Sequence, residues 1–119
     1  MKSERPYKRT DRVANEIQHI LGQIQTKFID LSDLGFITFS HVTISPDLKN
    51  AKVFFSVVQK KKSIVDIESE MNSKAKVFRK YLGQELQIKF TPTIKFFYDE
   101  TISYNQKLDT IFNNLDKKN

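Results

Sequence analysis

The 119-residue chain contains no cysteine and no tryptophan, and it has only three glycines and three prolines. Without cysteine it can form no disulfide, no thiolate zinc site and no cysteine nucleophile, as is common in reducing compartments. The glycines stand alone at positions 22, 35 and 83, so they build no glycine-rich phosphate loop. No apolar run approaches the ~18 residues of a membrane span, and no signal peptide precedes the first helical pattern. We therefore expect a soluble, cytoplasmic protein without a membrane partner.

Groups that could perform catalysis are also scarce. His19 and His41 lack the spacing of zinc ligands and are expected to be ordinary surface or partly buried histidines. Glu68 and Glu70 are two residues apart, so they do not face each other on a helix. We predict that the protein is not an enzyme and that it uses no metal, cofactor or small-molecule substrate.

Positive charge is the main compositional feature that is present. Twenty Lys and Arg against fourteen Asp and Glu give a net charge of +6. Residues 1–98 carry 17 basic and 10 acidic groups, whereas residues 99–119 carry 3 and 4, so the positive field belongs to the body of the chain. A basic folded surface favours a nucleic-acid partner, with an anionic membrane surface as the weaker option. The alternative is a basic protein with no specific polyanion partner.

Two segments have the apolar periodicity of amphipathic helices. The first runs from about Pro6 to Phe28, and Gly22 within it suggests a close approach by another element. The second runs from Ile64 to Leu82, with Gly83 as a candidate C-terminal cap or near-cap residue. The predicted core stripes are Val13, Ile17, Ile20, Leu21, Ile24 and Phe28 in the first helix, and Ile64, Ile67, Met71, Ala75, Phe78 and Leu82 in the second.

Strand patterns occupy the remaining apolar segments. Residues 36–45 alternate unevenly, so either both faces are partly covered or a bulge near Ser40 and His41 resets the alternation. After a turn at residues 45–50, residues 51–58 alternate and predict an antiparallel hairpin with the preceding strand. Residues 86–90 and 94–98 alternate on either side of Pro92, which marks an edge strand or a break. Residues 104–115 allow a short terminal helix.

The order helix, strand, strand, helix, strand predicts one α+β domain spanning residues 1–119, with residues 1–5 and 114–119 frayed. A helical crossover between the second and third strands allows parallel pairing. The simplest architecture is therefore a two-layer domain, in which helices cover one face of a three-stranded mixed sheet.

This order matches the type II KH arrangement, and four segments resemble the ribosome-binding factor A family. They are Arg9-x-Asp11-Arg12-Val13, residues 43–53 (TISPDLKNAKV), residues 78–82 (FRKYL) and residues 91–99 (TPTIKFFYD). The likeness covers roughly residues 5–112. It implies a monomeric, non-catalytic bacterial assembly factor, which binds the free small (30S) ribosomal subunit and its 16S rRNA and assists late rRNA maturation.

The chain departs from the family at one place. Family members usually have an Ala-x-Gly kink in the second helix, and the corresponding residues here are Lys74, Ala75 and Lys76. We expect a milder bend at Lys76, or a bend at Ser73, because a serine hydroxyl can bond back to a carbonyl one turn earlier and curve the helix.

The basic residues of the second helix are the first candidates for RNA binding. Lys74, Lys76, Arg79 and Lys80 lie within seven residues that hold no acidic group, whereas Asp66, Glu68 and Glu70 gather earlier in the same helix. Such segregation favours a phosphate contact over an ordinary solvated helix face.

Further basic candidates lie outside that helix. Arg5, Arg9 and Arg12, with Lys8 beside them, would form one stripe if the first helix begins early, or else a frayed basic terminus. Lys49 and Lys52 border the hairpin turn and are secondary candidates. The run Lys60 to Lys62 is interpreted as a solvated link.

Aromatic and apolar residues leave two alternatives open. Phe54 could stack a base on an open sheet face, but packing in the core is favoured for it and for the cluster Phe96 to Tyr98. The stripe of Tyr104, Leu108, Ile111 and Phe112 could instead contact a protein partner. A general KH-like RNA-binding protein, or a protein-interaction module unrelated to the ribosome, is therefore the alternative function.

Overall fold

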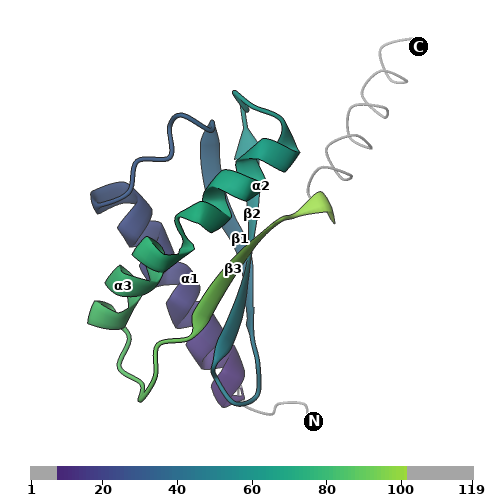
Figure 1. Cartoon of the computed structure of the whole chain (residues 1–119). Coiled ribbons are helices and arrows are strands. Elements are labelled where there is room, and N and C mark those ends of the chain that lie inside the picture. Colours follow the sequence, from purple (N-terminus) through teal and green to yellow (C-terminus); the bar gives the residue numbers. More distant parts are fainter. Residues whose placement is uncertain (1–7, 102–119) are drawn as a thin grey trace, which may run out of the picture.

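A computed structural model describes residues 8–101 of the chain, and six elements follow one another in it (Figure 1). They are α1 (Arg9–Lys27), β1 (Phe36–Ile44), β2 (Asn50–Val58), α2 (Ile64–Ser73), α3 (Ala75–Glu85) and β3 (Thr93–Tyr98). The predicted α+β class and element order are confirmed, except that the second predicted helix is divided in two. The predicted terminal helix and the frayed ends lie outside the described residues.

The three strands form one mixed sheet in the order β1-β2-β3. β2 pairs antiparallel with β1 and parallel with β3, as the hairpin and the helical crossover predicted. All three helices pack on the same side of this sheet (Figure 1). The β1–β2 turn is held by Asp47, whose carboxylate accepts bonds from the Ser45 hydroxyl (2.6 Å) and the Lys49 N–H (3.0 Å). These bonds, that from Ser45 foremost, lower the pKa of Asp47.

A bulge at Ser40 explains the uneven alternation of β1. The register with β2 shifts between Phe39 and His41, so one extra residue is inserted there. Ile37 and Phe39 before the bulge and Val42 after it are all buried against the helices. Of the two alternatives that the sequence left open, the bulge is confirmed.

The core lies between the sheet and the helices. Most of the predicted stripe of α1 is buried there, but Phe28 is 58% exposed and instead stacks on Tyr81 at 4.5 Å between ring centroids. Phe28 is therefore not a core residue, because it is the C-cap just after α1 ends at Lys27 and its ring lies against Tyr81 of α3. Three buried rings, Phe39, Phe78 and Phe96, contact one another at centroid distances of 5.2–5.9 Å.

The second predicted helix breaks at Lys74. This residue has φ −97° and ψ 1°, outside the α-helical region, and separates α2 from α3. The adjacent Ser73 hydroxyl donates to the Glu70 carbonyl at 2.6 Å, so an interruption beside Ser73 is confirmed, with its side-chain bond made three residues back rather than four. Lys76 lies inside α3, so the bend is not centred on Lys76.

The chain from Leu86 to Pro92 is an irregular link and not the strand that its alternation suggested. Pro92 has no N–H to donate to a ladder, so pairing with β2 begins after it, where the Thr93 N–H donates to the Lys49 carbonyl at 2.9 Å. Gly83 does not cap α3 either. The helix continues two residues further to Glu85, and Leu86 is its C-cap.

Gly22 also differs from its prediction, because a Cβ added there would meet no atom within 4 Å. No described element approaches it closely, and the residue retains only the entropic cost of glycine in a helix.

We therefore expect Gly22→Ala to raise the free energy of unfolding by about 0.5–1 kcal/mol, measured by urea denaturation. The matched control is Gly83→Ala, where the new Cβ would lie 2.8 Å from the Thr91 hydroxyl. Equal stabilisation by both variants would contradict this account.

Candidate nucleic-acid interface

The outer face of α3 presents the basic residues that the sequence indicated. Lys76 and Lys80 are both exposed, and their separation of four residues places them one turn apart on the same face. Phe78 and Leu82 occupy the opposite face and are buried in the core. Packing of the apolar stripe therefore orients both ammonium groups toward solvent.

An open groove of about 510 Å³ lies between α3 and the link 86–92. Its walls combine four cations with one exposed ring, and the lining residues are Lys76, Arg79, Lys80, Gly83, Lys89, Phe90 and Thr91. A concave surface with several cations raises the local concentration of anions. The groove is therefore suited to a polyanionic chain.

Arg79 holds the two walls of the groove together. Its Nη2 donates to the Thr91 carbonyl at 2.9 Å, and its Nε lies 3.2 Å from both the Thr91 and the Pro92 carbonyl oxygens. A guanidinium has five N–H donors, and these contacts use two of them. Arg79 thus fixes the link against α3 while further donors remain for an anion.

Lys89 and Phe90 belong to this groove and were missed by the sequence reasoning. Phe90 is 57% exposed, and the Nζ atoms of Lys89 and Lys49 lie 5.5 and 5.9 Å from its ring centroid. The alternating pattern of residues 86–90 had suggested a strand, which would have placed Phe90 on an apolar face. The useful signal was Lys89 itself, a cation next to an aromatic residue just before Pro92.

The other candidate residues are distributed around the groove or away from it. Lys49 lies beside the groove, because its ammonium group is positioned over the Phe90 ring. Lys52 projects from β2 on the face of the sheet away from the helices. Lys74 is half-buried at the break between α2 and α3. Lys8, Arg9 and Arg12 are exposed at the start of α1, where cations oppose the helix dipole and Asp11 offsets them in part. Arg5 lies outside the described residues.

The lysine run before α2 contains a paired residue. Lys62 Nζ donates to the Glu70 carboxylate at 2.6 Å, and this bond raises the pKa of Lys62. Glu70 of α2 thus forms an ion pair with the last lysine of the run Lys60 to Lys62. Residues 60–62 are all exposed, as expected for a solvated link, but Lys62 is also held by this ion pair.

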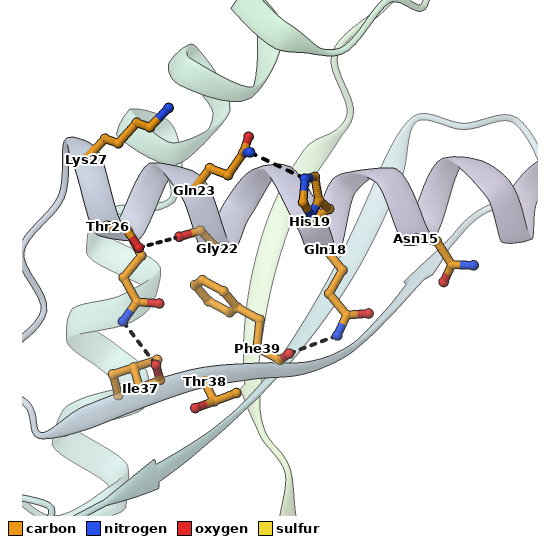
Figure 2. Close-up of a pocket in the computed structure, with 11 residues that line it drawn as sticks. Asn15, Gln18, His19, Gly22, Gln23, Thr26, Lys27, Ile37, Thr38 and Phe39 are labelled. Atoms are coloured by element: carbon orange, nitrogen blue, oxygen red, sulfur yellow. Dashed lines mark hydrogen bonds between the residues drawn. The ribbon is translucent and has the colours of Figure 1, made fainter.

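A second open groove, of about 680 Å³, runs between α1 and the edge of β1, but its lining is largely uncharged (Figure 2). Gln18 donates to the Phe39 carbonyl at 2.9 Å, and Gln25 donates to the Ile37 carbonyl at 3.0 Å. His19 and Gln23 contact each other at 3.3 Å. The side-chain amides of Gln18 and Gln25 are thus engaged by the β1 backbone. The groove of α3, which has four cations in its lining, is the better candidate for binding an anion. Among residues 8–101, no helix combines the length and apolarity needed to cross a membrane.

Comparison with known proteins gives a consistent result at the level of sequence. The family model described as Ribosome-binding factor A matches residues 9–112. The chain is 34% identical to Ribosome-binding factor A of Geobacter sp. (strain M21), over 87% of each chain. It is 37% identical to the protein of the same name from Legionella pneumophila (strain Lens), over 88% of this chain and 85% of that protein.

Solved structures with the same fold are also found. A Thermotoga maritima protein studied by solution NMR aligns with a TM-score of 0.64 and 26% identity, covering 78% of this chain and 89% of that one. The crystal structure of ribosome-binding factor A from Thermus thermophilus aligns with the same TM-score and 14% identity, covering 77% and 97%. The second likeness is one of fold alone.

Proposed function

Because the chain belongs to the ribosome-binding factor A family, we propose that it is a non-catalytic ribosome assembly factor of the cytoplasm. It binds the free small (30S) ribosomal subunit and its 16S rRNA and assists late maturation of that rRNA. The observation that carries the proposal is the groove of α3, which Lys76, Lys80 and Lys89 line together with the exposed ring of Phe90.

The chemistry of the groove suits a folded RNA. Ammonium groups neutralise phosphates without reading sequence, and an exposed ring can stack on an unpaired base. Arg79 holds the walls and adds a guanidinium donor. Beyond the groove, the proposal includes Arg5, Lys8, Arg9, Arg12, Lys49 and Lys74 as further phosphate contacts.

The test replaces Lys76, Lys80 and Lys89 with alanine in one variant. If each ammonium neutralises one phosphate, the slope of log affinity against log salt becomes shallower by about 2–3. Affinity for isolated small subunits should fall at low salt, while the fold stays intact because the three side chains are exposed. Binding is measured by co-sedimentation at several salt concentrations, with thermal unfolding recorded in parallel.

The matched control is a variant with Lys27, Lys60 and Lys61 replaced by alanine, which removes the same charge from exposed sites outside the groove. A similar slope change in both variants would reduce the interaction to nonspecific attraction. Wild-type protein should sediment with free small subunits and much less with large subunits or assembled ribosomes. Equal binding to all three would favour the alternative of a general RNA-binding protein.

A further inference from the structure

The face of the sheet that points away from the helices has an unusual composition. We call it the open sheet face, because no element within residues 8–101 covers it (Figure 1). Most of its side chains are polar, as expected for a solvated face, and include Thr38, Thr43, Lys52, Ser56 and Lys95. Two phenylalanines nevertheless occupy its centre, Phe54 on β2 and Phe97 on β3.

These phenylalanines belong to a row of three rings that crosses the sheet. His41, Phe54 and Phe97 come from β1, β2 and β3 and are direct register partners. The ring centroids are 6.0 Å apart for His41 and Phe54, and 5.5 Å apart for Phe54 and Phe97. Phe54 and Phe97 are only half-buried and lie outside the core, so the expectation that both pack in the core is wrong.

Basic side chains lie along one side of the ring row. Lys52 and Lys95 are register partners on neighbouring strands, and Lys95 Nζ lies 5.5 Å from the centroid of Phe97. The acidic Asp99 follows β3, beyond the other side of the row, and accepts a bond from the Ser40 hydroxyl at 2.7 Å. The two sides of the ring row therefore differ in charge: Lys52 and Lys95 lie on one side, and the hydrogen-bonded carboxylate of Asp99 lies on the other.

This composition selects among classes of partner. An apolar helix laid across the face would bury two ammonium groups and several hydroxyls without partners, which is costly. A ligand that combines flat rings with negative charge would satisfy the phenylalanines and the lysines together. Single-stranded nucleic acid has both, and sheets that bind it present rings from adjacent strands to stack bases.

We propose that the open sheet face binds single-stranded RNA, with bases stacked on Phe54 and Phe97 and phosphates neutralised by Lys52 and Lys95. The choice of RNA over DNA rests on the proposed function, which this inference deepens by adding an unpaired segment of RNA as a second contact. The groove of α3 and the open sheet face are built from different residues. Each can therefore be removed separately.

The experiment uses the full chain and two fluorescein-labelled probes in an anisotropy titration. One is a single-stranded RNA of about ten nucleotides without self-complementarity, and the other is an abasic ribose-phosphate chain of the same length. In the double variant Phe54→Leu with Phe97→Leu, affinity for the RNA should fall at least about tenfold, with no change in salt slope. Affinity for the abasic chain should not change, because it has no bases to stack.

Phe28→Leu is the control, because it removes a ring that also stacks on a neighbouring ring, but on the helix side of the molecule. It should bind both probes as the wild type does. In the unmodified protein, the aromatic NMR signals of Phe54 and Phe97 should shift when the RNA is added and should not shift with the abasic chain. This measurement decides the matter even if the double variant folds poorly.

Two outcomes would overturn the inference: unchanged RNA affinity in a folded double variant, or ring signals that do not respond to RNA. An equal loss for both probes would also overturn it, because charge would then explain the binding. Sedimentation with small subunits is a separate measurement. If subunits bind but the RNA does not reach the rings, only this inference fails, and if the rings bind RNA but subunits do not bind, only the proposed function fails.

Discussion

Replacing Phe78 with alanine is expected to lower the free energy of unfolding by about 3–5 kcal/mol. Phe78 is fully buried on the inner face of α3, and its ring meets Phe39 of β1 and Phe96 of β3 at centroid distances of 5.9 and 5.2 Å. The substitution would open a cavity where three elements meet. Because small domains are stable by only about 5–15 kcal/mol, the variant should be close to its unfolding threshold at moderate temperature.

Urea denaturation followed by circular dichroism measures this loss. Phe90→Ala is the matched control, since the same atoms are removed from a ring that is largely exposed, and its cost should stay below about 0.5 kcal/mol. A loss of less than about 1 kcal/mol for Phe78→Ala would mean that the ring is not at the centre of the core.

Replacing Asn72 with alanine is expected to cost about 2–3 kcal/mol, the second largest effect. The Asn72 amide donates to the Phe96 carbonyl at 2.9 Å, and its oxygen accepts from the Phe96 N–H at 2.8 Å. Alanine would leave both polar groups on the outer edge of β3 without these partners, and each unmade bond to a partly buried group costs about 1–3 kcal/mol. The amide also donates to the Glu68 carbonyl at 3.0 Å within α2.

Asn15→Ala is the control for this variant, because Asn15 is an exposed asparagine of α1. Asn72→Asp provides a graded test, since its carboxylate can accept from the Phe96 N–H but cannot donate to the carbonyl. Its loss should be comparable to or smaller than that of alanine. A loss below about 0.5 kcal/mol for Asn72→Ala would show that water replaces the amide at no cost.

The sequence predicted those parts of the fold that depend on local periodicity. The stripe of α1 and the alternation of β2 each repeat over several turns or residues, so a single exception such as Phe28 does not hide them. The bulge at Ser40 was visible because it shifts the buried parity between Phe39 and Val42. The break at Lys74 could be anticipated only approximately, because neither glycine nor proline marks it.

The link 86–92 was misinterpreted for a physical reason. Leu86 is buried as the C-cap of α3, Ile88 is half-buried, and intervening residues face water, so a pinned loop produces the same alternation as a strand. Hydrogen bonds from Arg79 to the carbonyls of Thr91 and Pro92 decide between the two, and they join residues twelve or more positions apart. No local pattern contains that information.

The candidate groove was predictable on one side only. Lys76, Arg79 and Lys80 share a helix, and their spacing already placed them together. Lys49 and Phe90 become neighbours because β3 starts beside the β1–β2 turn, where the Thr93 N–H meets the Lys49 carbonyl. That contact follows from the parallel pairing of β2 with β3, whose register no local pattern determines.

The outer edges of the sheet are both occupied by side chains from the helices. Gln18 and Gln25 bind the carbonyls of Phe39 and Ile37 on β1, and Asn72 and Glu68 bind Phe96 and Tyr98 on β3. An extended peptide that joined either edge as a fourth strand would first have to displace these amides or the Glu68 carboxylate. The sheet is thereby protected against edge-to-edge polymerisation. The loss of Asn72 would expose part of the β3 edge, on which copies of the chain could aggregate.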